Sequence, residues 1–170
     1  HYKAQLRKYG VKVLSATENI SEGPEGIILE SMLEGMAEYY SAELSEKVIR
    51  GHTENALKCK YNGGTPTFGY VIDKDKCYQI DPHTAPVVLE SFTRYANGAT
   101  MKEVMQYLVE SGFTTVRGRK IDLNFISRLL KNRKYIGEYS YRQIVTPGGI
   151  PAIVSQDLFD RVQQRLEVNR

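Results

Sequence analysis

The sequence has few of the residues that metal centres and disulfide frameworks require. It contains only two cysteines and three histidines in 170 residues. Cys59 and Cys77 do not stand at a metal-ligand spacing, and no two of His1, His52 and His83 do so either. We therefore expect two free thiols in a reducing compartment, and no metal or other cofactor.

The sequence also lacks the motifs of a membrane protein and of a self-contained enzyme. No apolar run is long enough to cross a bilayer, and there is no signal-peptide pattern. No glycine-rich phosphate loop or nucleophile elbow is present, and the serines have no evident base partner. These absences predict a cytoplasmic binding module with no membrane partner.

The cations gather in one segment, residues 115–135. Because the net charge of the whole chain is only +3, the position of the cations carries more weight than their number. Asp122 is the only acid in this segment. The apolar spacing predicts a helix over residues 122–131 whose buried side carries Phe125, Ile126, Leu129 and Leu130.

The outer side of this predicted helix and its flanks are polar and cationic. The outer side carries Asn124, Ser127, Arg128 and Lys131. The flanking cations are Arg117, Arg119 and Lys120 before the helix and Arg133 and Lys134 after it. A helix of this kind suits a nucleic-acid groove and its phosphates, so double-stranded DNA is the expected partner. The alternative is a helical domain whose charged residues simply face water.

Proline and glycine divide the rest of the chain into a fold that we expect to be mainly α with small β elements (α+β). The predicted order is a helix at 2–9, a strand at 11–14, a long helix at 24–60, a hairpin of 68–72 with 77–80, helices at 82–95, 100–112 and 122–131, a hairpin of 135–145 with 150–154, and a final helix capped by Ser155. Thr100 and Glu103 form a capping-box pattern. The glycine pair and the proline of 62–67 place a domain boundary between 1–61 and 62–170.

The helix expected at 24–60 is too long for a compact small domain, because it would extend about 50 Å. Its first half is apolar nearly all round, so it must be buried on more than one side, against its own domain and a partner subunit. Gly35 either permits the close approach of a second helix or is merely tolerated there. This helix therefore predicts contact with a partner subunit.

The helices at 82–95, 100–112 and 122–131 resemble a helix-turn-helix whose connection, 111–120, is longer than usual. The hairpin after them would act as a wing that offers Tyr141, Arg142 and Gln143. The linker is cationic and has few side chains, so it suits a DNA minor groove. Its candidate contacts are Lys58, Lys60, Asn62, Gly63, Gly64 and Thr65. A transcription regulator and a protein-interaction module without a DNA role are the alternatives.

Five sequence motifs together resemble the large serine recombinases of phages and mobile elements, along essentially the whole chain. They are Glu-Gly-Pro-Glu-Gly at 22–26, Ala-Glu-Tyr-Tyr-Ser-Ala-Glu-Leu-Ser-Glu-Lys at 37–47, Gly-Gly-Thr-Pro-Thr-Phe-Gly-Tyr at 63–70, Leu-Leu-Lys-Asn-Arg-Lys-Tyr-Ile-Gly at 129–137, and Pro-Ala-Ile-Val-Ser at 151–155 followed by Phe159 and Val162. The resemblance implies the end of an α/β catalytic domain joined to a recombinase DNA-binding domain, in a bacterial or phage-encoded protein.

The resemblance also implies a mechanism. A serine of the family attacks a DNA phosphodiester to form a 5′-phosphoserine, and paired subunits cut, rotate and religate the duplexes without a cofactor. That serine lies near the start of the catalytic domain, so the resemblance implies that it is absent from this chain, which should be inactive alone. Glu46 and Lys47 match a Glu-Arg pair that supports the active site, although Lys47 loses the bidentate fork of arginine. The helix at 24–60 would be the dimer and synapsis helix, so the resemblance implies a homodimer or tetramer on DNA.

Overall fold

The computed structural model of the chain describes residues 5–6, 8–11 and 23–168. It divides into two compact units, His1–Arg50 (unit 1) and Gly51–Arg170 (unit 2). The fold is mainly helical with two small antiparallel hairpins, as the sequence predicts. The boundary expected after residue 61 stays a prediction, and the strand expected at 11–14 falls, beyond Val11, outside the described residues. Among the helices of the described ranges, none is apolar enough over a sufficient length to cross a membrane.

The long helix α2 spans Pro24–Leu57 and begins at the proline that predicts it. It ends three residues before the predicted position because Cys59 takes a positive φ of 53° and the backbone N–H of Lys60 donates to the Asn55 carbonyl at 2.8 Å. The apolar side chains of its first half are exposed in the single chain, so their burial against a partner stays a prediction. They include Ile27, Ile28, Met32, Met36, Tyr39 and Tyr40.

Two helices of unit 2 begin at local capping signals. α3 spans Ala85–Ala96, three residues later than predicted, because Asp81 first accepts hydrogen bonds from the backbone of His83 and the hydroxyl of Thr84. α4 spans Met101–Glu110, and the predicted capping box between Thr100 and Glu103 is present with both of its bonds.

α5 spans Leu123–Lys131 and is the helix expected from the basic segment. Asp122 caps it: the backbone N–H of Phe125 donates to Asp122 Oδ1 at 2.7 Å. Ile126, Leu129 and Leu130 are buried as predicted, whereas Phe125 is half-buried. The single acid of the segment therefore has a structural role at the start of the helix.

Loss of this cap should destabilise unit 2. We expect Asp122→Ala to lower the free energy of unfolding by about 1 kcal/mol, because the first turn of α5 loses an acceptor for its N–H groups. Asp122→Asn is the matched control, since the amide oxygen accepts the same bond, and it should cost only a few tenths of that amount. Urea denaturation followed by circular dichroism measures both. An equal loss in the two variants would mean that the charge, and not the cap, stabilises the helix.

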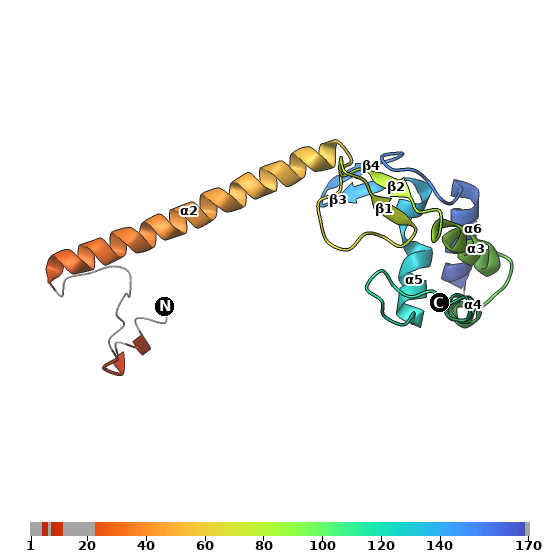
Figure 1. Ribbon diagram of the computed structural model, residues 1–170, viewed down its shortest axis with the longest axis horizontal. Helices are drawn as coiled ribbons and strands as arrows, with labels where there is room; N and C mark the ends of the chain where they lie inside the picture. The colour runs from red at the N-terminus through yellow and green to blue at the C-terminus, as the bar shows by residue number, and fades with distance from the viewer. Residues whose placement is uncertain (1–4, 7, 12–22, 169–170) are drawn as a thin grey trace. The chain divides into compact units, whose positions relative to one another are not determined.

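The core of unit 2 lies among four helices and two hairpins (Figure 1). α3 packs against α4, α5 and α6, which spans Gln156–Val168, and α5 packs against α4 and α6. The first hairpin pairs β1 (Tyr70–Ile72) with β2 (Tyr78–Ile80), as predicted. Its Tyr70 and Tyr78 belong to the core, and so do Phe92 of α3 and Phe159 of α6. α6 begins after Ser155, whose hydroxyl accepts the backbone N–H of Leu158 at 3.3 Å.

The second hairpin differs from the prediction of 135–145 paired with 150–154, which is wrong. The 3-10 helix η1 occupies Arg133–Ile136, and the hairpin pairs β3 (Tyr139–Tyr141) with β4 (Ile144–Thr146). The two-residue turn between them relies on Arg142, with a φ of 51°, and carries no Asn-Gly signal. Gly149 was expected to lie in the turn, but it is needed for close packing: a Cβ there would lie 2.6 Å from Cys59 Sγ and 2.8 Å from Tyr139 Cβ.

Three tyrosine hydroxyl groups tie the segment after α2 to the segment after α5. Tyr139 donates to the Lys60 carbonyl at 2.7 Å, and Tyr135 donates to the Phe68 carbonyl at 2.9 Å. The Tyr70 hydroxyl lies 2.8 Å from the Lys134 carbonyl and 2.7 Å from that of Pro151. All of these acceptors are backbone groups. These hydrogen bonds connect segments that are more than 60 residues apart in the sequence.

Candidate nucleic-acid interface

The outer side of α5 presents the residues that the sequence predicts. Asn124, Arg128 and Lys131 are exposed, and Ser127 is half-buried. We call these four residues the recognition face. The Arg128 side chain folds along the helix, where its Nε donates to the Asn124 carbonyl at 3.3 Å. The guanidinium leaves most of its donors free of helix contacts, so it can form a bidentate contact with a flat acceptor.

The connection before α5 is a compact turn. The backbone N–H of Thr115 donates to the Arg119 carbonyl at 2.9 Å, and the Thr115 hydroxyl accepts the backbone N–H of Arg119 at 3.0 Å. This turn exposes Arg117, Arg119 and Lys120. Arg117 is also held by the linker, because its Nε donates to Thr65 Oγ1 at 2.9 Å.

The turn, the linker and α5 enclose a groove of about 460 Å³. Arg117, Arg119 and Arg128 line it together with Thr65 and Phe125. We call it the arginine groove. Among the described residues, none of its three guanidinium groups pairs with a carboxylate. Three guanidinium groups without a carboxylate partner among the described residues give this groove a positive field, which would attract an anion.

The linker is more firmly attached than a free arm would be. Lys60 and Asn62 are half-buried, and Asn62 Nδ2 donates to the His52 carbonyl at 2.9 Å. The exposed tip is Gly63, Gly64 and Thr65, where both glycines take φ angles of 96° and 104° that other residues rarely adopt. This tip ends at the arginine groove.

The cations after α5 lie in different surroundings. Arg133 is exposed and its Nε lies 2.8 Å from Glu138 Oε2, so part of its charge is compensated. Lys134 is half-buried, and its Nζ lies 5.3 Å from the centre of the Tyr78 ring and 3.4 Å from the Tyr78 hydroxyl. Burial lowers the pKa of Lys134 and raises that of Tyr78 to about 12, so the phenol stays neutral. A phosphate next to Lys134 would favour its charged form.

The remaining predicted site residues are not among those that line the arginine groove. Lys58 is exposed directly after α2, and Arg142 is exposed at the hairpin turn, with its guanidinium 5.6 Å from the Tyr141 ring centre. Glu46 and Lys47 are exposed on the part of α2 that belongs to unit 1, where Lys47 Nζ forms an ion pair with Glu43 at 2.7 Å. They belong to unit 1, whereas the residues of the arginine groove belong to unit 2.

Sequence reasoning missed the residues that position the cations. Thr115 holds the turn, Asn132 caps η1 by accepting the backbone N–H of Lys134 at 3.1 Å, and Tyr78 receives the Lys134 side chain. A Thr-Val-Arg-Gly turn and an Asn before a helix are local signals that could have been read. The contact between Lys134 and Tyr78 joins positions 56 residues apart, and no local pattern predicts it.

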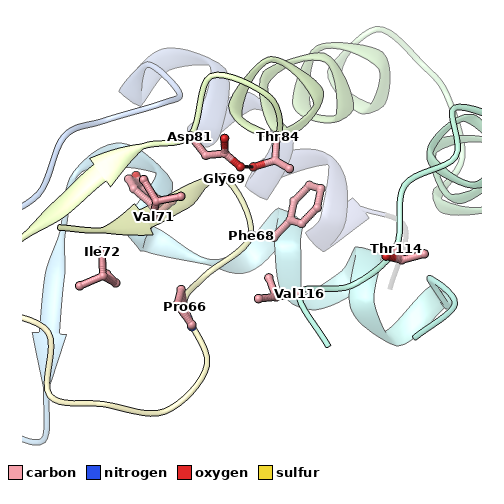
Figure 2. Close-up of a pocket in the computed structure, with 10 residues that line it drawn as sticks. Pro66, Phe68, Gly69, Val71, Ile72, Asp81, Thr84, Thr114 and Val116 are labelled. Atoms are coloured by element: carbon pink, nitrogen blue, oxygen red, sulfur yellow. Dashed lines mark hydrogen bonds between the residues drawn. The ribbon is translucent and has the colours of Figure 1, made fainter. Parts of the chain in front are cut away.

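A second groove, of about 490 Å³, lies beside the first and has an apolar lining (Figure 2). β1 forms one wall through Val71 and Ile72, and the turn before α5 contributes Val116. At its edge the Thr84 hydroxyl donates to Asp81 Oδ2, and this hydrogen bond lowers the pKa of the Asp81 carboxyl, so one ionised group borders the apolar lining.

Comparison with known proteins assigns the family. Residues 82–169, just over half of the chain, match the protein family described as Recombinase. No curated protein matches the chain. The fold resembles a crystal structure of an LSR–DNA complex, with a TM-score of 0.59 and 20% identity over 72% of this chain. It also resembles a structure that concerns the sequence requirements of the Listeria innocua prophage attP site, with a TM-score of 0.58 and 20% identity over 71% of this chain.

The chain covers 38% and 51% of the lengths of those two structures, respectively. At 20% identity they establish the fold, while the family match distinguishes a recombinase from a transcription regulator. The chain belongs to the Recombinase family, and this confirms its resemblance to the large serine recombinases.

Proposed function

We propose that unit 2 recognises duplex DNA as part of a site-specific recombinase, with α5 in the major groove. The observation that supports this most directly is the recognition face, which stands exposed on a helix whose opposite side is buried. The major groove is about 12 Å wide and admits one α-helix. Asn124 and Arg128 carry the side chains that pair most specifically with adenine and guanine, respectively.

The surrounding cations would fix the position of α5 on the duplex. In this proposal Arg117, Arg119 and Lys120 contact phosphates, and the tip at Gly63–Gly64 lies along the minor groove, where its lack of side chains permits close approach. Arg142 at the hairpin turn is a further contact to the backbone. Phosphate contacts set the orientation, while the recognition face reads the bases.

The chemistry of the whole protein is also a proposal. We infer that a serine outside this chain forms the phosphoserine link, and that α2 pairs with α2 of a second copy. The exposed apolar residues in the first half of α2 support such pairing, because a solvated helix has no need of them. No cofactor is required, since the covalent link conserves the energy of the phosphodiester.

Salt dependence tests DNA recognition. Release of counterions makes the logarithm of the affinity fall linearly with the logarithm of the salt concentration, and about six phosphate contacts give a slope of about −5. Fluorescence anisotropy of a labelled duplex over a series of salt concentrations measures the slope. Salt-insensitive binding, or no binding to any duplex, would instead favour a protein-interaction module.

We expect Lys134→Met to weaken binding to all DNA sequences alike and to reduce the salt slope by about 1, because one phosphate contact is lost. Methionine keeps the unbranched stem beside Tyr78 and removes only the charge. Lys74→Met, at an exposed position in the β1–β2 turn, is the control and should leave the slope unchanged. A change in base preference without a change in slope would contradict the phosphate assignment.

The chain by itself should not cut DNA. Incubation with a nicked duplex, which traps covalent intermediates, should give no protein–DNA adduct that survives denaturing electrophoresis. Detection of such an adduct would show that a nucleophile lies within these 170 residues.

A further inference from the structure

We propose that Val116 determines part of the DNA specificity by contacting the C5 methyl group of a thymine. This inference rests on the proposed DNA recognition by unit 2, and adds a residue that reads a base without a hydrogen bond. In the major groove, thymine differs from the other bases by this methyl group, and apolar side chains are the groups that recognise it.

Val116 is exposed although its backbone is held in place. Its exposed fraction is 49%, even though it lies in the turn that Thr115 closes with two hydrogen bonds to Arg119. A third bond, from the backbone N–H of Gly118 to the Thr115 carbonyl, measures 2.7 Å, and Gly118 takes a φ of 69°. The turn therefore fixes an aliphatic side chain at the surface.

The surroundings of Val116 are cationic on one side and apolar on the other. It follows Thr115 and precedes Arg117, and it lines the arginine groove together with Arg128. It also lines the apolar groove with Phe68 and Val71 (Figure 2), so its side chain borders both grooves. Because Arg128 and Val116 line the same groove, we place this thymine next to the base that Arg128 contacts.

Deoxyuridine substitution tests this contact, because it removes the methyl group and keeps base pairing and the O4 acceptor. Duplexes are first selected from a randomised library with the wild-type chain. Each thymine of the selected duplex is then replaced singly. At one thymine the affinity should fall about fourfold, which is ~0.8 kcal/mol for one buried methyl-sized group. Val116→Ala should bind the thymine duplex about fourfold more weakly and show no further loss with deoxyuridine.

Val71→Ala is the matched control. Val71 is also a valine, has a similar exposed fraction of 46%, and lines the apolar groove but not the arginine groove. This variant should keep the full sensitivity to deoxyuridine. The contact is overturned if wild-type binding is insensitive to deoxyuridine at every thymine. It is also overturned if Val116→Ala loses as much affinity as the wild type when thymine is replaced by deoxyuridine. Either result leaves salt-dependent DNA binding intact. Failure to select any duplex overturns the proposed DNA recognition as well.

Discussion

Replacing Tyr135 by alanine is expected to destabilise unit 2 by about 3–5 kcal/mol, because it leaves a large cavity in the core. The side chain is only 2% exposed. Its ring stacks on Tyr70 with centroids 6.1 Å apart, and meets the Phe92 ring edge to face at 5.7 Å. Its hydroxyl also donates to the Phe68 carbonyl, so the substitution removes both packing and a hydrogen bond across unit 2.

Tyr135→Phe separates these two contributions. Phenylalanine keeps the ring and leaves the Phe68 carbonyl without its donor, which should cost about 1–3 kcal/mol. Burial raises the pKa of Tyr135, so the hydroxyl remains a neutral donor throughout the neutral range. Urea denaturation at neutral pH measures both variants. If Tyr135→Phe were as destabilising as Tyr135→Ala, the hydrogen bond and not the packing would be the main contribution.

Arg128→Ala is expected to have the largest effect on DNA specificity. If Arg128 makes a bidentate contact with a guanine, its loss should cost about 1–3 kcal/mol on the preferred duplex, or about 5- to 150-fold in affinity. Duplexes that differ only at the base pair contacted by Arg128 should bind the variant with nearly equal affinity. Competition binding against a panel of such duplexes measures this preference.

The control for Arg128→Ala is Arg161→Ala, which removes an exposed arginine of α6 that does not belong to the recognition face. It should leave the base preference unchanged. Retention of the wild-type preference by Arg128→Ala would mean that α5 does not lie in the major groove. A loss of affinity that is uniform across the panel would assign Arg128 to a phosphate.

The elements that the sequence predicts well have their signals within a few residues. The capping box at Thr100 and Glu103 and the cap at Asp122 specify where α4 and α5 begin, and both helices form there. The apolar spacing of α5 decides which side is buried, so the exposed recognition face could also be predicted.

The parts that could not be predicted depend on contacts between distant segments. The hydrogen bond from Arg117 to Thr65 joins positions 52 residues apart and closes the arginine groove. The second hairpin was misassigned because a Pro-Gly-Gly run is typical of a turn, whereas Gly149 is required for close packing against Tyr139. Whether a glycine permits a positive φ or a close contact depends on its neighbours in space.

The three tyrosine hydroxyl groups that bind backbone carbonyls have a consequence for which substitutions this chain can tolerate. A bond to a carbonyl does not depend on the side chain at that position, so Lys60 can be exchanged without loss of the acceptor, whereas Phe68 must also fill the core. The hydrogen bonds of these tyrosines thus do not depend on the side chains of the residues that accept them. Under the proposed DNA recognition, substitutions on the recognition face and at the exposed tip of the linker would alter the base preference without disturbing these hydrogen bonds.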